Sequence, residues 1–490
     1  MFAGLPRALP DDDGIRESIR AMRAADGLLL GVLDDDPTGS QAVHDVEVVT
    51  ALEENAYAAA LSGPAATCFV LTNTRSLDEP AAAERNTLVG RGLTAVAQRR
   101  DARIQLVSRS DSTLRGHLMA EVTALQAVRR EMLGSAFDGV LLVPAFLEAG
   151  RLTAADIHWA RIGSGLVPVG ETEFARDPTF GYTASNLRDF VMEKSGGTVE
   201  RGDVRSISLA DIRLGGPSRV RDLLSDVRDG TWVVINATEY SDLDTVAYGV
   251  LQAERSGRSF LFRTGPSFVG ALTGLGPKAP LRHRDIWPCA GHGVGRPRVG
   301  RHGVGRHGVG GHGLIVVGSH VGLTSRQVAA LRARGGTTDI ELDVPAVISG
   351  AGDVVAATAA QVAAALGRSD VLLYTSRAVA AGRDSAGSLA IARQVSAALS
   401  RTVRAALAAR PAWVIAKGGI TSHDVAVHGL GIRRATVAGQ LFPGVISVFR
   451  PIDAAPEAIG VPYVVFAGNV GNDGTLAQVV AILNGEQEGT

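Results

Sequence analysis

Short apolar runs that alternate with helical segments constrain the fold of this chain more than any other feature of its sequence. Strands buried on both faces and separated by helices form mostly parallel sheets. The first half of the chain therefore predicts a mostly parallel sheet covered by helices. Its strand-like runs are 27–33, 66–72, 103–108, 139–146, 231–237 and 259–264, and its clearest helical patterns are 79–99 and 117–133.

The second half of the chain repeats this pattern. Apolar runs predict strands at 313–319, 370–376, 412–419, 444–450 and 463–469, and helical patterns cover 324–335 and 378–409. A chain of 490 residues is long enough for two domains. We therefore predict an α/β fold of two domains, each with a mostly parallel sheet flanked by helices, over residues 1–285 and 313–490.

A glycine- and histidine-rich segment separates the two halves. Residues 289–313 follow a five-residue repeat in which His292, His302, His307 and His312 hold the same place. Glycine at this density leaves the backbone too free for a packed element, so we predict a flexible linker or loop over 286–312. Metal binding by the histidines is the alternative, and it is the weaker one because the pentads themselves, from residue 291 onward, contain no carboxylate or cysteine.

Composition argues against several classes of protein. A formal net charge of -1 provides no bulk charge to hold a nucleic acid or a membrane surface. The acidic, proline-interrupted N-terminus does not resemble a signal peptide, and no apolar run approaches the roughly 20 residues of a membrane span. The two cysteines, Cys68 and Cys289, lack metal-ligand spacing and fit a reducing compartment. We expect a cytoplasmic protein without nucleic-acid or membrane partners.

Polar residues follow four successive strands of the first half. The segments are DDDPTGS (34–40), TNTRS (72–76), SRSDSTLRGH (108–117) and PAFLEAGR (144–151). In the first of them, Pro37 and Gly39 predict a turn that ends the strand. Because a parallel sheet binds ligands at the carboxyl ends of its strands, we expect these segments to share one pocket.

The residue types in these segments complement a sugar acid. Arginines bind carboxylates or phosphates through paired donors, whereas carboxylates bind hydroxyls or Mg²⁺, or accept a proton. For any single residue, ordinary capping and turn formation is the alternative. The predicted substrate-binding residues are Asp34, Arg75, Arg109, Ser112, Arg115 and Arg151, and the predicted catalytic carboxylates are Asp35, Asp36 and Asp111.

The strand ends of the second half are rich in glycine instead. They are VGSHVGLTSRQ (317–327), AKGGITSHDVA (416–426), FPGV (442–445) and FAGNVGNDGT (466–475). Glycine lets backbone N–H groups approach phosphates without a Cβ in the way. Neither a Walker A loop nor a Rossmann fingerprint is present in the sequence. Tight turns would explain any one cluster, but together the clusters suggest a face that binds phosphates.

The ordered series DDDPTGS, NTRS, RSDSTLRG, PAFLEAGR, KGGITS, PGV and AGN resembles the four-carbon acid sugar kinases over roughly residues 27–285 and 313–480. The resemblance implies that the N-terminal domain binds the sugar acid and that the C-terminal domain binds ATP. Enzymes of this family are often homodimers. This chain departs from the family pattern at Arg109, Val321, Phe466 and Val470. The predicted nucleotide-binding residues are Ser319, Lys417, Gly418, Gly419, Ile420, Thr421, Gly444 and Gly468.

The sequence thus predicts an ATP- and Mg²⁺-dependent kinase that phosphorylates a hydroxyl of threonate, erythronate, 3-oxo-tetronate or a similar acid in a cleft between the domains. The sequence leaves open which carboxylate accepts the proton and which serves the metal. One alternative is a metal-assisted lyase or isomerase of sugar acids, active without ATP. Another is a regulatory protein that binds a sugar acid or a nucleotide without turnover.

Overall fold

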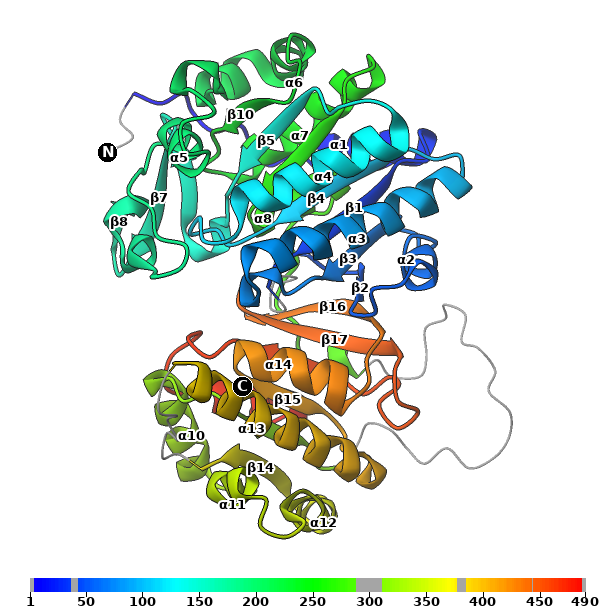
Figure 1. The fold of residues 1–490 in the computed structure, drawn as a ribbon, viewed down its shortest axis with the longest axis vertical. Helices are drawn as coiled ribbons and strands as arrows, with labels where there is room; N and C mark the ends of the chain where they lie inside the picture. The colour runs from blue at the N-terminus through cyan, green and yellow to red at the C-terminus, as the bar shows by residue number, and fades with distance from the viewer. Residues whose placement is uncertain (1–3, 37–42, 288–310, 377–384, 443, 487–490) are drawn as a thin grey trace. The chain divides into compact units, whose positions relative to one another are not determined.

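The structure, a computed structural model, describes residues 4–36, 43–287, 311–376, 385–442 and 444–486 (Figure 1). The chain divides into two compact units, residues 1–278 and 279–490. Each unit holds a mostly parallel sheet with helices, so the predicted α/β fold is confirmed. The predicted turn at Pro37 and Gly39, and the histidine repeat up to residue 310, lie outside the described residues.

A parallel sheet forms the centre of unit 1. Its strand order is β2-β3-β1-β4-β11-β5-β10-β9, and each neighbouring pair runs parallel. The central strands are buried along almost their whole length, as their apolar runs predict. The bounds are β1 Leu29–Asp34, β2 Glu47–Val49, β3 Thr67–Leu71, β4 Ile104–Arg109, β5 Gly139–Val143, β9 Arg205–Ile207, β10 Thr231–Ile235 and β11 Phe260–Thr264.

Helices cover this sheet and close the core of unit 1 (Figure 1). Helix α3 has the predicted bounds 79–99, because Asp78 caps its first turn by accepting from the Ala81 N–H and Pro80 follows in that turn. The helices are α1 Asp13–Ala25, α2 Glu54–Ala60, α3 Glu79–Arg99, α4 Leu118–Leu133, α5 Leu187–Lys194, α6 Leu209–Ser225, α7 Tyr240–Arg255 and α8 Pro266–Thr273.

A small antiparallel sheet, which the sequence analysis did not predict, follows β5. It consists of β6 Arg151–Ala154, β7 Ile157–Ile162 and β8 Gly165–Pro168. The strand β6 begins with Arg151, so this sheet starts at the carboxyl end of the main sheet. It thereby carries its own side chains to the predicted substrate residues.

Unit 2 has the strand order β13-β14-β12-β15-β18-β17-β16. The first five strands run parallel, and β17 and β16 complete the sheet as antiparallel strands. The strands are β12 Leu314–Val317, β13 Thr337–Leu342, β14 Asp370–Thr375, β15 Val414–Lys417, β16 Arg434–Phe442, β17 Ile446–Asp453 and β18 Tyr463–Phe466. The helices are α9 His283–Ile286, α10 Gly322–Arg334, α11 Val344–Ser349, α12 Val354–Leu366, α13 Ser385–Ala406, α14 Gly419–Asp424 and α15 Thr475–Asn484.

Each unit has its own apolar core, built from the inward faces of its sheet and helices. Among the helices of the described ranges, none combines the length and the apolar character that crossing a membrane requires.

Candidate functional site

The aspartate triplet lies at the carboxyl end of β1, in the middle of the unit 1 sheet. Asp34 is the last residue of β1, and it is in register with Leu71 of β3 on one side and Arg109 of β4 on the other. Arg75 follows β3 in a 3₁₀ turn. The parallel register therefore brings the predicted arginines to the predicted carboxylates.

Each aspartate of the triplet is paired with an arginine. Arg109 Nη1 donates to Asp34 Oδ1 at 2.8 Å. The guanidinium of Arg75 donates to Asp35 Oδ1 at 2.6 Å and to Asp36 Oδ2 at 2.9 Å. These contacts offset the mutual repulsion of three adjacent carboxylates, and they occupy donors that we predicted for the substrate.

Burial makes Asp34 and Asp35 weaker acids than an exposed aspartate. Burial raises the pKa of Asp34 to about 7, although the Arg109 guanidinium opposes this effect. Burial also raises the pKa of Asp35, against the opposing effect of Arg75. Asp35 accepts a further bond from Ser110 Oγ at 2.6 Å. Asp36 differs, because 27% of its side chain is exposed, so it is the member of the triplet that a ligand can reach.

The loop between β4 and α4 holds Asp111 in its ionised form. Arg115 Nε donates to Asp111 Oδ2 at 2.6 Å, and Thr113 Oγ1 donates to the same oxygen. Burial is the largest influence and raises the pKa of Asp111, but Arg75, Arg115 and Thr113 together outweigh it and lower this pKa to about 2. A carboxylate this acidic is a poor proton acceptor near neutral pH and a suitable neighbour for a cation.

Among the described residues, Arg151 is the arginine of the site that lacks an acidic partner, and its Nη1 donates to the Ala149 carbonyl. No carboxylate of the described residues forms an ion pair with it, and its Nε is buried without a hydrogen-bond partner. The guanidiniums of Arg115 and Arg151 lie 5.3 and 5.8 Å from the centre of the Phe174 ring. Burial lowers the pKa of Arg151. An anionic ligand would remove this cost.

Ser112 is positioned by a histidine on the small sheet. Its carbonyl oxygen lies 2.8 Å from Nε2 of His158, so this nitrogen carries the proton and donates. Nδ1 of the same ring lies 2.9 Å from Thr153 Oγ1. Burial lowers the pKa of His158 to about 4, which keeps the ring neutral near pH 7. His158 therefore fixes the backbone of the loop that carries Asp111.

A buried ion pair under the loop was not identified from the sequence. Arg263 on β11 donates to Glu121 on α4 and, at 2.6 Å, to Ser108 Oγ. Glu121 also accepts from Thr74 Oγ1 at 2.6 Å. The sequence feature that could have identified Arg263 is its charge, which interrupts the apolar run SFLFRT (259–264). The pair joins β11, α4 and the turn of Arg75 beneath the aspartates.

The predicted nucleotide residues also share one edge, that of the unit 2 sheet. They follow β12, β15 and β18, which are neighbours and end in register, with Val317 beside Lys417 and Lys417 beside Phe466. The turn that joins β16 to β17 lies at the same edge, because Ile446 pairs with Phe466. All eight predicted nucleotide residues, Ser319, Lys417, Gly418, Gly419, Ile420, Thr421, Gly444 and Gly468, therefore lie at or just beyond one sheet edge.

Contacts between these loops leave no room for larger side chains. A Cβ on Gly468 would lie 2.8 Å from Ser319 Oγ. A Cβ on Gly418 would lie 3.1 Å from Ser319 Cβ, and Gly418 has a φ of 124°. The next two residues face outward, since a Cβ on Gly419 would meet nothing within 4 Å and Ile420 is 68% exposed. This turn presents backbone and one apolar side chain to a ligand.

Lys417 is buried beneath this edge. Its Nζ donates to the carbonyl of Ala467 at 2.6 Å and lies 3.7 Å from the centre of the Phe466 ring. Burial lowers the pKa of Lys417 to about 7. The lysine therefore fixes the loop that leads to Gly468, and a direct contact with phosphate stays a prediction.

The described residues contain no group of three histidine, cysteine or acidic side chains that could hold a metal ion by themselves. Mg²⁺ commonly needs only one or two carboxylates when it arrives with a nucleotide's phosphates. Asp111 fits that role, since it is ionised and its bonds from Arg115 and Thr113 both go to Oδ2.

Solved structures share this fold. A Haemophilus influenzae protein, HI1011, aligns at a TM-score of 0.60 and 17% identity over 92% of this chain and 100% of that chain. A Salmonella typhimurium LT2 protein, provisionally named a tRNA synthase, aligns at a TM-score of 0.64 and 18% identity over 92% of this chain and 98% of that chain. Similarity at these identities shows the fold alone. No curated protein matches the chain.

Two domain families match most of the chain. Residues 30–272 match the sugar-binding N-terminal domain, which covers every predicted substrate and catalytic residue. Residues 314–476 match the nucleotide-binding C-terminal domain, which covers every predicted nucleotide residue. The chain therefore has the two-domain architecture of the four-carbon acid sugar kinase family, a sugar-binding domain followed by a nucleotide-binding domain.

Proposed function

We propose that this protein is an ATP-dependent kinase that phosphorylates a hydroxyl of a small sugar acid, such as threonate, erythronate or 3-oxo-tetronate. The observation that carries the proposal is Arg151 in the sugar-binding domain, a half-buried guanidinium whose Nε is buried without a partner and which forms no ion pair with a carboxylate of the described residues. The nucleotide-binding domain supplies the second half of the argument. Homodimer formation and a cytoplasmic location stay predictions.

The substrate carboxylate would bind Arg151, with Arg115 beside it on the same aromatic ring. Two guanidiniums hold a carboxylate through charge-assisted hydrogen bonds, which fixes the acid end of the molecule. The remaining groups of the site are carboxylates and hydroxyls, which suit the substrate hydroxyls. Of the arginines that we predicted for the substrate, Arg75 and Arg109 hold the aspartate triplet. Arg115 holds Asp111 through its Nε and would also contact the acid, and Arg151 would bind the acid.

In the reaction, a substrate hydroxyl oxygen attacks the γ-phosphorus of ATP. The bond from that phosphorus to the β–γ bridging oxygen breaks, ADP leaves, and the hydroxyl proton passes to a carboxylate. We assign this proton to Asp36, because Asp35 is buried in its pair with Arg75 and Asp111 is too acidic. Mg²⁺ bound to the ATP phosphates, held on the protein side by Asp111, would supply charge neutralisation. The reaction requires ATP and the acid to meet during turnover.

A coupled assay of ADP release tests the proposal. ADP should form with ATP, Mg²⁺ and at least one of threonate, erythronate and 3-oxo-tetronate, and background hydrolysis should be far slower without the acid. Conversion of the acid without ATP would instead support a lyase or isomerase. Thermal stabilisation by ATP or an acid without ADP release would support a regulatory binding protein, because a ligand that prefers the native state raises the melting temperature.

The Arg151→Gln variant should bind the acid more weakly. Loss of a charge-assisted bond to a carboxylate is worth about 1.5–3 kcal/mol, so KM for the acid should rise about tenfold to a hundredfold, with KM for ATP unchanged. Steady-state kinetics with each substrate varied in turn measures both values. The matched control is Arg221→Gln, whose arginine is on the surface beside Asp222. Equal KM values in the two variants would show that Arg151 does not bind the substrate.

A further inference from the structure

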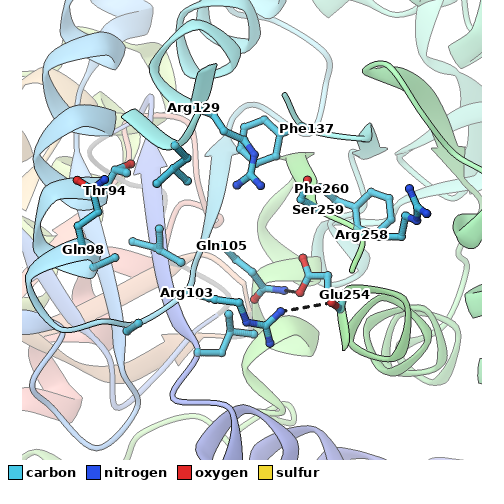
Figure 2. A pocket seen from close by; sticks show the side chains of 15 residues that line it. Thr94, Gln98, Arg103, Gln105, Arg129, Phe137, Glu254, Arg258, Ser259 and Phe260 are labelled. Atoms are coloured by element: carbon cyan, nitrogen blue, oxygen red, sulfur yellow. Dashed lines mark hydrogen bonds between the residues drawn. The ribbon is translucent and has the colours of Figure 1, made fainter. Parts of the chain in front are cut away.

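A cavity of about 210 Å³ lies at the amino end of the unit 1 sheet, opposite to the aspartate triplet (Figure 2). Its walls come from the starts of β4 and β11 and from the ends of α3, α4 and α7. Gln105 of β4 lines it, whereas Arg109 at the other end of β4 belongs to the candidate sugar-acid site. Four residues of strand span roughly 13 Å, so the cavity is separate from that site.

The walls of the cavity are apolar around a buried carboxylate. Figure 2 shows the side chains of Glu254 and Gln105 meeting inside it, with the rings of Phe137 and Phe260 on its walls. Gln105 Nε2 donates to Glu254 Oε2 at 2.8 Å, and Gln105 Oε1 accepts from Arg23 Nη1 at 2.6 Å. Glu254 is 6% exposed. Small-molecule sites usually combine apolar walls with a few polar groups held in fixed positions, as this cavity does.

Three arginines reach the cavity, and two of them have acidic partners. Arg103 pairs with Asp26 at 3.1 Å, and Arg258 pairs with Asp138 at 2.9 Å. Arg129 forms no ion pair with any carboxylate that the structure describes. Its Nε donates to the Ala136 carbonyl at 3.3 Å, and its guanidinium lies 4.6 Å from the centre of the Phe137 ring.

The guanidinium of Arg129 points into the cavity in Figure 2. Basic residues also collect at helix C-termini because they offset the helix dipole. That effect does not account for the arginines of the cavity, because the basic residues in the last turns of α3, α4 and α7 are Arg99, Arg130 and Arg255, and none of these lines it. The fixed Nε leaves the two terminal nitrogens as donors for a ligand.

We propose that this cavity binds a small organic monoanion, a carboxylic acid whose carboxylate pairs with Arg129 and whose apolar body lies between Phe137 and Phe260. A carboxylate suits the position better than a phosphate, because a dianion would lie near the Glu254 carboxyl. Burial raises the pKa of Glu254 to about 7, with Gln105, Arg103, Arg23 and Arg129 opposing this effect. Near neutral pH Glu254 is therefore partly protonated, so its repulsion of an anion is reduced.

The test titrates acetate, butyrate and benzoate into the full chain and follows binding by calorimetry at pH 6.5. At least one acid should bind, and the neutral benzamide should bind more weakly than benzoate. Arg129→Gln should weaken the bound acid about tenfold or more. The matched control is Arg130→Gln on the exposed side of the same helix, and it should change the affinity less than about twofold.

A second control separates this cavity from the candidate sugar-acid site. Arg151→Gln should change the affinity of the cavity for acetate, butyrate or benzoate by less than about twofold, because Arg151 lies at the other end of the sheet. Binding of the acid should weaken from pH 6 to pH 8 as Glu254 ionises. The proposal is overturned if none of the three acids binds at 20 mM, if benzamide binds as well as benzoate, or if Arg151→Gln and not Arg129→Gln removes binding. Circular dichroism of each variant checks folding, and Arg129→Lys retains the charge should Arg129→Gln fail to fold.

Discussion

Replacing Asp36 with asparagine is expected to lower kcat of the proposed kinase reaction about a hundredfold to ten-thousandfold, the usual contribution of a positioned general base. Asparagine keeps the size of the side chain and its contact with Arg75, but it cannot accept the proton of the attacking hydroxyl. ATP binding should change less than twofold, because the predicted nucleotide residues all lie in unit 2. Single-turnover ADP formation measures the first effect, and calorimetric titration with ATP measures the second.

The matched control for this experiment is Asp222→Asn, which removes a surface carboxylate of the same unit from its pair with Arg221. Its kcat should equal that of the wild type. A loss of ATP affinity in Asp36→Asn that matches its loss of turnover would show that Asp36 binds the nucleotide or its metal. Unchanged turnover would move the general base to another carboxylate.

The aspartate triplet also illustrates how far the sequence could predict the site. Its position at a strand end follows from the apolar run before it and from the rule that parallel strands end at one edge. The pairing of Asp34 with Arg109 and of Asp35 with Arg75 depends on the strand order β3-β1-β4, which alternation alone does not determine. Asp36 differs from its neighbours only through burial, and burial requires the fold.

Residues of the small antiparallel sheet were beyond prediction for a different reason. The strands β6 to β8 are short, only β7 alternates in burial, and they follow a loop that we read as part of the pocket. His158 of β7 therefore carried no local signal, and neither did Phe174, which lies in the 3₁₀ turn Glu173–Arg176 beyond the sheet, although both contact the site. Most main-sheet strands gave a stronger signal, because a short apolar run bounded by turn residues is typical of a strand buried in a sheet. The predicted helix 79–99 was confirmed, since capping by Asp78 and the adjacent proline are local features.

The Glu121→Gln variant is expected to lower the thermal stability of unit 1 strongly. Glu121 is 2% exposed, and the change would leave the Arg263 guanidinium buried without its counter-charge. Removing one partner of a buried ion pair costs about 3–5 kcal/mol, which corresponds to a fall of roughly 10 °C in the transition temperature of a unit this large. Differential scanning calorimetry of the full chain measures the shift.

Two further variants decide whether the effect comes from the unpaired charge. Glu131 lies on the same helix, but its pair with Arg91 is about half-exposed. Glu131→Gln should therefore lower the free energy of unfolding by less than about 1 kcal/mol. The double variant Glu121→Leu with Arg263→Met removes both charges and fills the space with apolar groups. It should be more stable than Glu121→Gln, because an apolar pair of similar volume often replaces a buried ion pair at little cost. If the double variant melts at a lower temperature than the single one, the hydrogen bonds to Ser108 and Thr74 contribute more to stability than the charge pairing does. In that case those bonds hold the turn of Arg75 against α4.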